Sequence, residues 1–317
     1  MTSDWFDRKQ VQHSFSRAAE KYDGAAKLQR VIDATLMESL EYVEDPGFYG
    51  AKPQVIVDAG SGTGASSKLI QAKYPDATVF SVDAAQGMLR FAQPPPMSLS
   101  ERARAIFKKP INRPIPINAD VRRLPFADGS VDVIYSNLCL QWVEDLQGVL
   151  NGFRRVLKPG GMVLFSTFGP ETLIELREAF AQADDAASHV SPFANIQQWG
   201  DALVATGFRN PVLDRDVMVE GSESLRDLMK YLKDIGATNA LNDRRKTLTG
   251  RARFTKATEA YDQWRHPGNG KLPVTWEVIY ATAWAPSADQ PIREEGVDLV
   301  RIPVNQIKIR KRPRERE

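Results

Sequence analysis

A glycine-rich turn between a strand and a helix constrains the fold of this chain more than any other feature. Val55 begins a short, β-branched apolar run that ends at Asp58. Three glycines follow before a helix-compatible stretch, at Gly60, Gly62 and Gly64. Glycine has no Cβ and tolerates positive φ, so such a turn lets the backbone approach a ligand at a helix N-terminus. The spacing also satisfies the dinucleotide-binding fingerprint, and a tight turn without a ligand is a further alternative.

Two acidic residues argue against a pyrophosphate-binding dinucleotide site. The Asp58 carboxylate is placed to help hold an ammonium group, directly or through water. A second apolar strand ends in Asp83, where an acid on the next strand takes ribose hydroxyls. The pattern resembles the class I S-adenosylmethionine (SAM) methyltransferases. This resemblance implies an α/β fold, namely a Rossmann-like, seven-stranded, mostly parallel sheet with helices on both faces.

Further contacts with the cofactor are expected where later strands end. Asp120 is expected to meet the adenine amino group, with the backbone N–H of Val121 near a ring nitrogen. Met88 suits an adenine contact and the core equally well. Because open α/β sheets place their chemistry at the carboxyl ends of strands, the segment 136–142, with Asn137, should border the methyl group. Within it, Leu138 and Leu140 are the candidates for packing.

The order of elements predicts one large domain with insertions. Strands at 212–219 and 274–281 complete a seven-stranded sheet only if residues 170–194 and 222–272 are insertions, which we expect to form a helical cap over the site. The predicted division is N-terminal helices over the active site (1–45), a methyltransferase core with these insertions (46–286) and a basic C-terminal extension (287–317).

Tyr22 lies where the helical pattern of residues 5–45 breaks, at Tyr22-Asp23-Gly24. Since helices before the first strand of this fold commonly cover the cofactor mouth, Tyr22 is either an active-site residue or a packing tyrosine. The basic segment 94–117 is either a solvated loop or a docking patch for an acidic partner. We expect the basic tail to be a solvated terminus.

Bulk composition excludes several classes of protein. The 42 Lys and Arg residues balance 40 Asp and Glu, so net charge gives no sign of nucleic acid. The single cysteine excludes an intramolecular disulfide, and no stretch approaches the roughly 20 apolar residues of a membrane span. Three scattered histidines offer no metal-ligand spacing, so no metal site is expected. We expect a soluble, cytoplasmic protein without a membrane partner.

Nucleic acid is not expected as the methyl acceptor. Enzymes that methylate amino groups of DNA need a Pro-Pro-aromatic turn after strand four, where this chain has Asn137-Leu-Cys-Leu. Methylation of a cytosine carbon needs a cysteine nucleophile. Cys139 lacks the proline that usually precedes such a cysteine, so it is expected to pack as a small apolar residue.

From about Lys9 to Pro286 the chain resembles one family, the malonyl-[acyl-carrier protein] O-methyltransferases of biotin synthesis. The segments that carry the resemblance are Phe15–Asp23, Leu28–Arg30, Asp58–Gly64, Ser136–Trp142, Ser166–Arg177, Leu232–Ala237 and Leu248–Gly250. Ser61 stands where the family often has cysteine, and Asp234 replaces a glycine of the common cap motif. No family role is carried over to 94–117 or to the tail.

The resemblance implies methyl transfer from SAM to the free carboxylate of malonyl-acyl carrier protein, giving the methyl ester that primes the pimeloyl moiety of biotin. Malonyl-coenzyme A is an alternative acceptor. Selecting a carboxylate requires a cation or strong donors, and the candidates are Tyr22, Arg177 and Lys233, each of which suits a surface or cap position equally well. Methylation of another small carboxylate or a quinone remains an alternative, as does a protein-arginine hydroxylase or assembly factor of the same fold. The oligomeric state stays open.

Overall fold

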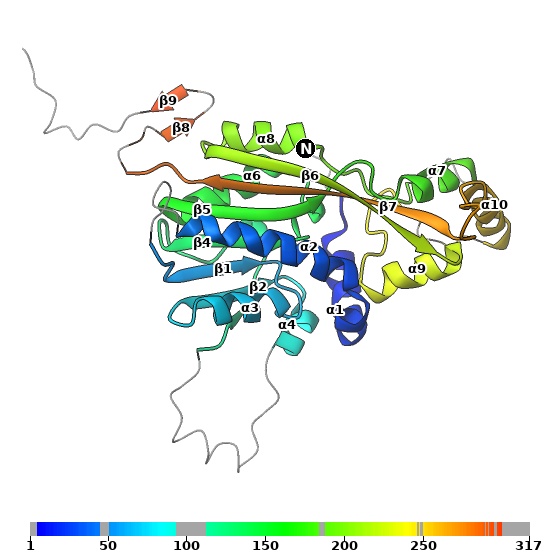
Figure 1. Ribbon diagram of the computed structural model, residues 1–317, viewed down its shortest axis with the longest axis horizontal. Helices are drawn as coiled ribbons and strands as arrows, with labels where there is room; N and C mark the ends of the chain where they lie inside the picture. Colours follow the sequence, from blue (N-terminus) through cyan, green and yellow to red (C-terminus); the bar gives the residue numbers. More distant parts are fainter. Residues whose placement is uncertain are drawn as a thin grey trace, which may run out of the picture.

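The central sheet places the carboxyl ends of its parallel strands along one edge. In the computed structural model the seven strands have the order β3-β2-β1-β4-β5-β7-β6 (Figure 1). All neighbouring pairs are parallel except those of β7, which runs antiparallel to β5 and β6. The strands are β1 (Val55–Ala59), β2 (Thr78–Asp83), β3 (Ile115–Asn118), β4 (Val131–Asn137), β5 (Leu157–Phe168), β6 (Arg209–Ser222) and β7 (Leu272–Trp284). The predicted fold class is confirmed.

The structure describes residues 5–44, 51–92, 112–183, 188–245, 247, 250–288, 290, 292–294 and 297–299. Its helices are α1 (Arg8–Ala25), α2 (Lys27–Glu38), η1 (Ser39–Val43), α3 (Ala65–Lys73), α4 (Gln86–Ala92), η2 (Val121–Arg123), η3 (Leu140–Trp142), α6 (Leu146–Val156), α7 (Ile174–Ala183), α8 (Ile196–Ala205), α9 (Leu225–Asp234) and α10 (Arg251–Asp262). A short hairpin, β8 (Ile292–Glu294) and β9 (Val297–Leu299), follows the sheet. Among the described helices, none is long and apolar enough to cross a bilayer.

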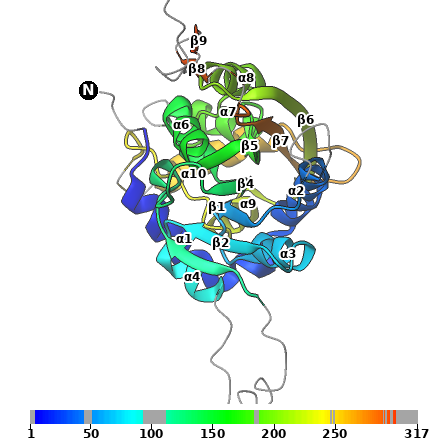
Figure 2. The ribbon, with the colours of Figure 1, turned by 90° about the vertical axis from the view of Figure 1, so that its left-hand side faces the viewer.

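Helices cover both faces of the sheet because successive side chains of each strand point to opposite sides. Ile56 of β1 belongs to the core that includes Ile32 of α2, whereas its neighbour Val57 belongs to the core that includes Phe153 of α6. Figure 2 shows α6 and α8 on one side of the sheet and α2 and α3 on the other. Nearly continuous apolar strands are typical of a parallel sheet buried on both faces.

The N-terminal helical pattern does not break at Tyr22-Asp23-Gly24, so that prediction was wrong. Helix α1 continues to Ala25, and the backbone N–H of Ala26 closes its last turn on the Tyr22 carbonyl at 2.8 Å. Glycine only weakens a helix, by about 1 kcal/mol relative to alanine. Tyr22 therefore lies inside the last turns of α1 and not in a loop.

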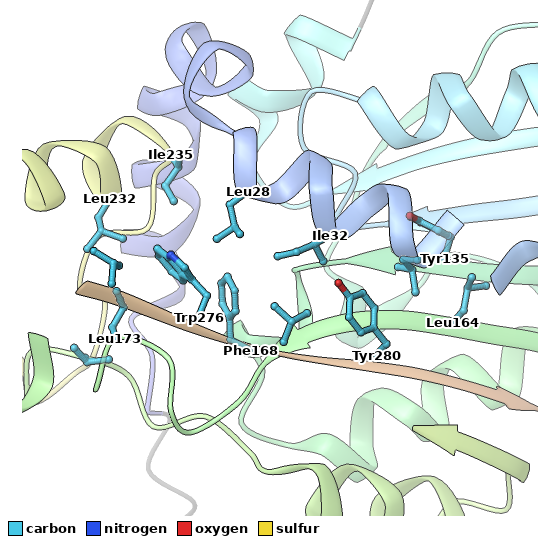
Figure 3. Packing of buried hydrophobic residues seen from close by; sticks show 14 of the residues in the cluster. Leu28, Ile32, Tyr135, Leu164, Phe168, Leu173, Leu232, Ile235, Trp276 and Tyr280 are labelled. Carbon is cyan, nitrogen blue, oxygen red and sulfur yellow. The ribbon is translucent and has the colours of Figure 1, made fainter. Parts of the chain in front are cut away.

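Strands β6 and β7 are longer than predicted and extend beyond the end of β5. The pairing of β5 with β7 stops at Phe168 and Val278, but β6 and β7 stay paired to Ser222 and Leu272. This two-stranded extension connects to α9 and α10, which gather with α7 at one end of the molecule (Figure 1). Figure 3 shows Leu232 of α9 beside Trp276 of β7, so the core is continuous from the sheet into these helices.

Several predictions fall on residues outside the described part of the chain. These are most of the basic segment 94–117, most of the extension 287–317, and Leu248 and Thr249 of one resemblance segment. At the end of the basic segment, Ile115 to Ile117 belong to β3 and not to a loop, because Ile115 pairs with Phe80 of β2.

Candidate functional site

The turn between β1 and α3 holds its three glycines in the left-handed region. Gly60, Gly62 and Gly64 have φ angles of +79°, +55° and +75°. A Cβ on Gly60 would overlap the side chain of Cys139, whereas a Cβ on Gly62 would meet no heavy atom within 4 Å. Glycine at position 60 is thus required for packing, and the backbone at Gly62 stands open.

The open side of this turn borders a cavity, here called the turn cavity. Its walls come from the turn, the ends of β2 and β4, η2, η3, α4 and α1. Its lining residues are Phe6, Arg8, Val11, Gln12, Phe15, Tyr22, Gly60, Gly62, Asp83, Ala84, Ala85, Met88, Asp120, Val121, Arg122, Asn137, Leu138, Cys139, Trp142 and Val143. Seven of the nine residues predicted to bind the cofactor are among them; Asp58 and Gly64 are not.

Asp83 lies at the end of β2 and links the glycine turn to α4. Its two carboxylate oxygens accept hydrogen bonds from the backbone N–H groups of Gly62, at 2.9 Å, and Ala85, at 2.7 Å. Burial raises the pKa of the Asp83 carboxyl, and the two N–H donors offset part of that shift. A carboxylate has about four acceptor sites, so Asp83 retains the capacity to accept from a pair of ligand hydroxyls.

Asp58 lies beneath the turn, with 1% of its surface exposed. It accepts a hydrogen bond from the Ser67 hydroxyl at 2.5 Å, and Ser67 in turn accepts one from Ser81 at 2.7 Å. Burial raises the pKa of Asp58 to about 7, even though the Ser67 hydroxyl counteracts the shift. Because Asp58 does not line the turn cavity, its predicted contact with an ammonium group stays a prediction.

Asp120 caps η2 and is held by its neighbour Arg122. The Arg122 guanidinium donates to the two carboxylate oxygens at 2.8 and 2.5 Å. Burial alone would raise the pKa of Asp120, but the hydrogen bonds and charge of Arg122 bring it below the usual value. Asp120 is therefore a fixed anion on the wall of the turn cavity, and Val121 lies next to it.

Met88 and Asn137 line the turn cavity and also hold neighbouring elements together. Met88 lines the turn cavity and also packs with Ala19 of α1. The Asn137 amide donates to the Gln29 carbonyl at 3.2 Å and accepts from the Ser166 hydroxyl at 2.6 Å. These bonds tie the end of β4 to α2 and β5, so the position of the Asn137 side chain is set before any ligand arrives.

One face of α1 forms a wall of the turn cavity. Arg8, Val11, Gln12, Phe15 and Tyr22 all line it. Residues three and four apart share a helix face, and Arg8, Val11, Gln12 and Phe15 follow this spacing. We predicted a role for Tyr22 alone, although helical periodicity would have found the other four.

A second, larger cavity of about 360 Å³ lies between α1, α7, α9 and the extension of β7, and is here called the cap cavity. It shares Phe15, Tyr22, Leu138 and Trp142 with the turn cavity, so the two cavities meet at these residues. The rest of its lining is Gln29, Gln141, Phe168, Thr172, Leu173, Leu176, Phe180, His189, Val190, Ser191, Phe193, Met229, Leu232, Lys233, Ile235, Ala237, Thr238, Asn239 and Trp276.

Leu138 packs against the core, as we predicted, and it also lines both cavities. Leu140 is fully buried, as expected. Leu138 has a φ of +50°, which is uncommon for a residue with a branched side chain. Its backbone N–H bonds to the Ser166 carbonyl and hydroxyl, at 3.1 and 3.0 Å, which holds it in this conformation. Leu138 thereby lies at the junction of the two cavities.

Trp142 also lies at the junction, fixed by two aromatic neighbours. Its ring meets Phe6 and Phe15 edge to face, with centroids 5.6 and 5.5 Å apart. Such pairs contribute about 0.5–1.5 kcal/mol beyond the area they bury. The contact joins η3, directly after β4, to α1 and so closes one side of the junction.

Tyr22 contributes the free hydroxyl of the junction. No residue in the described part of the chain hydrogen-bonds to this hydroxyl. Burial, followed by the charge of Asp83, holds the pKa of Tyr22 well above its usual value. Tyr22 is therefore a neutral hydrogen-bond donor throughout the physiological range of pH.

Of the other two predicted carboxylate ligands, Lys233 lines a cavity with Tyr22 and Arg177 does not. Arg177 is absent from the cavity lining, and its guanidinium donates to the carbonyls of Pro170, at 2.9 Å, and Thr172, at 3.2 Å. Burial lowers the pKa of this guanidinium. Lys233 lines the cap cavity together with Tyr22, and its side chain is exposed on α9.

Comparison with known proteins agrees with this geometry. A family model described as "Methyltransferase domain" matches residues 57–165, which include the glycine turn and β4. The YcgJ protein from Bacillus subtilis, a solved structure, superposes with a TM-score of 0.52 at 16% identity, covering 80% of this chain and 99% of that one. A likeness at this identity supports the fold alone.

Two relatives extend the similarity over most of the chain. A malonyl-[acyl-carrier protein] O-methyltransferase of Xylella fastidiosa (strain M23) is 49% identical over 307 residues, covering 97% of this chain and 98% of that protein. The biotin biosynthesis bifunctional protein BioHC of Saccharophagus degradans is 36% identical over 277 residues, which are 86% of this chain and 46% of that protein.

Proposed function

The chain belongs to the malonyl-[acyl-carrier protein] O-methyltransferase family, and we propose that its acceptor is the free carboxylate of a malonyl thioester on acyl carrier protein. The cofactor is S-adenosylmethionine. The product is the malonyl methyl ester that primes the pimeloyl part of biotin, and malonyl-coenzyme A is an alternative acceptor. Residues 1–45 act as helices over the site, 46–286 as the core with its cap, and 287–317 as an extension.

The observation that carries this proposal is the meeting of two cavities of different character. The turn cavity is lined by fixed polar groups, including Asp83 and Asp120. The cap cavity is mostly apolar and reaches the turn cavity at Tyr22 and Trp142. A methyltransferase needs the donor and the acceptor in contact at one point with water excluded, and this arrangement meets that requirement.

The turn cavity suits the cofactor on three counts. The open backbone at Gly62 leaves room for a ligand beside the glycine turn. Asp83 keeps acceptor capacity for ribose hydroxyls, and Asp120 and Val121 stand where adenine is expected. When bound there, SAM supplies an electrophilic methyl group on a sulfonium sulfur.

The acceptor needs little chemical help from the protein. A malonyl carboxylate is ionised near neutral pH, so no general base is required. One carboxylate oxygen forms the new bond to the methyl carbon as the carbon–sulfur bond breaks, and the sulfur retains the electron pair. The Tyr22 hydroxyl donates to the carboxylate and orients it, while the apolar walls keep water away. Alignment of this kind is equivalent to about 10⁵–10⁸ M effective concentration.

Intact mass spectrometry tests the proposal directly. Malonyl-loaded acyl carrier protein is incubated with the protein and SAM, with acetyl-loaded carrier as the control. We expect the malonyl species alone to gain one methyl group, which a mild esterase removes. If SAM binds and no methyl is transferred to malonyl carrier, the acceptor is wrong, and a quinone, another carboxylate or a partner protein becomes the next candidate.

A further inference from the structure

The cap cavity is larger than the group that it would present for methylation. Its volume of about 360 Å³ falls within the range of roughly 300–1,000 Å³ that holds drug-sized ligands. A malonyl group has three carbons and fills only the part next to the junction. A mostly apolar cavity gains most when a ligand excludes water from all of it, so the remaining volume calls for a longer occupant.

The lining residues show where this occupant would enter. Besides the junction at Tyr22 and Trp142, the cavity reaches the molecular surface on α9. Met229 and Lys233 are the exposed residues of the lining, and both belong to α9. The cavity, here called the passage, thus joins exposed residues of α9 to the junction.

The walls of this passage combine apolar surface with amide groups. Phe168, Leu173 and Leu176 are buried and apolar. Gln29 and Gln141 also contribute to the lining, and the Oε1 atom of each is buried and accepts no hydrogen bond from the part of the chain that the structure describes. A buried carbonyl without a donor costs about 1–3 kcal/mol, so a ligand that carries amide N–H groups suits such walls.

The charge at the entrance is predominantly positive. Arg226, Lys230 and Lys233 are exposed along α9, with Asp227 and Asp234 beside them. Asp234 is engaged with Lys21 of α1 at 3.7 Å. Lys233 therefore offers a cation at the mouth to a phosphate group.

We propose that the cap cavity is the channel for the pantetheine arm of the thioester substrate, with the phosphate of the arm at Lys233 and its amide-bearing chain between α7 and α9. This inference rests on the proposed function, because it names how the carrier presents the malonyl group. A pantetheine arm is a flexible chain with two amides and a dimethyl-substituted carbon, and the passage offers amide acceptors and apolar walls to match.

The test compares thioesters that differ only in the arm. Malonyl-N-acetylcysteamine lacks most of the arm, malonyl-pantetheine lacks the phosphate, and malonyl-phosphopantetheine has both. For the wild-type protein we expect kcat/KM to rise about tenfold from the first to the second, since even one or two buried methylenes or hydrogen bonds supply that factor. The phosphate of malonyl-phosphopantetheine should raise kcat/KM further. Lys233→Met should remove only this gain from the phosphate.

Variants at the passage separate the channel from the chemistry. Met229→Trp narrows the exposed mouth, and Leu176→Trp fills the middle of the passage; Leu69→Trp, on the exposed face of α3, is the matched control. We expect the first two variants to remove the advantage of the longer arm while the affinity for SAM stays unchanged. Calorimetry with free phosphopantetheine should show binding to the wild type and about tenfold weaker binding to Met229→Trp.

The outcomes distinguish this inference from the proposed function. Equal kcat/KM for all three thioesters would overturn the channel and leave carboxyl methylation intact. Binding of phosphopantetheine that Met229→Trp weakens, without methylation of any malonyl thioester, would support the channel and overturn the acceptor.

Discussion

The Thr63 hydroxyl donates a hydrogen bond of 2.6 Å to the Asp23 carboxylate, joining the glycine turn to the end of α1 across 40 positions of sequence. A second bond of the same kind follows on α2, where Asp33 accepts from Ser66 at 2.7 Å. The helix that walls the turn cavity is therefore fastened to the turn itself. We therefore expect ligand binding at the turn to depend on the position of this end of α1, where Tyr22 lies one residue before Asp23.

Thr63→Val should weaken SAM binding without unfolding the protein. Valine keeps the shape of threonine in a position that is 2% exposed, but it cannot donate to Asp23. A hydrogen bond of this kind contributes about 1 kcal/mol, or roughly a fivefold change in the dissociation constant by calorimetry. Thr35→Val, which removes a longer bond on exposed α2, is the control. Equal affinity in both variants would show that the bond does not hold the wall of the cavity.

Gly60→Ala should lower the stability of the fold, whereas Gly62→Ala should weaken SAM binding. A methyl at position 60 overlaps Cys139, so we expect a large fall in the unfolding temperature. At position 62 the methyl has space, and the positive φ costs about 1–2 kcal/mol. Gly62→Ala should therefore fold but bind SAM more weakly, because its methyl stands on the open side of the turn. Thermal unfolding and calorimetry on both variants check this, and the same pattern of loss in the two would contradict it.

Asp58 should make stability depend on pH. Burial raises the pKa of this carboxyl from 3.8 in the unfolded chain to about 7 in the folded protein. Between these two pH values the carboxyl is protonated in the folded protein and ionised in the unfolded chain. The contribution to stability is complete below about pH 4 and is lost as pH rises through about pH 7. The side-chain amide introduced by Asp58→Asn stays neutral at every pH, so the stability of this variant relative to wild type should increase with pH, by at most about 1.4 kcal/mol per unit.

Urea unfolding of wild type and Asp58→Asn at about pH 5 and about pH 8 measures this difference. The comparison cancels the contributions of Asp33 and Asp83, whose pKa values are also raised by burial. A difference in unfolding free energy that is the same at both pH values would mean that Asp58 is already ionised in the fold.

Tyr22→Phe should slow methyl transfer more than it weakens cofactor binding. The variant keeps the ring that lines both cavities and removes only the free hydroxyl. A hydrogen bond to a charged group contributes about 1.5–3 kcal/mol, so we expect kcat/KM for the malonyl thioester to fall about 10- to 100-fold. Calorimetry should give a dissociation constant for SAM close to that of wild type. Unchanged turnover would assign Tyr22 to packing alone.

Arg177→Met should lower the stability of the protein more than it weakens binding of the acceptor. The guanidinium holds the carbonyls of Pro170 and Thr172 at the start of α7 and does not line either cavity. Losing these bonds should cost about 1–3 kcal/mol, visible as a lower midpoint in urea, with little change in KM for the thioester. A large rise in KM at unchanged stability would restore Arg177 as a carboxylate ligand.

The glycine turn and the sheet could be predicted from the sequence because their signals are local. Glycine permits the positive φ of Gly60, Gly62 and Gly64. The strands that carry Asp58, Asp83 and Asn137 at or near their ends are short apolar runs, so the sequence locates their boundaries within a few residues. Seven of the nine predicted cofactor residues line one cavity for the same reason, since parallel strands end at one edge of the sheet.

The position of α1 and the walls of the cap cavity were decided by tertiary structure. Local turn signals predicted a break at Gly24, but packing and the bond from Thr63 to Asp23 keep the helix intact to Ala25. Arg177 has the charge of a carboxylate ligand, yet its direction depends on carbonyls at Pro170 and Thr172 that only the folded loop presents. Residue type determines which interactions a side chain can make, whereas contacts between distant segments determine the direction of that side chain.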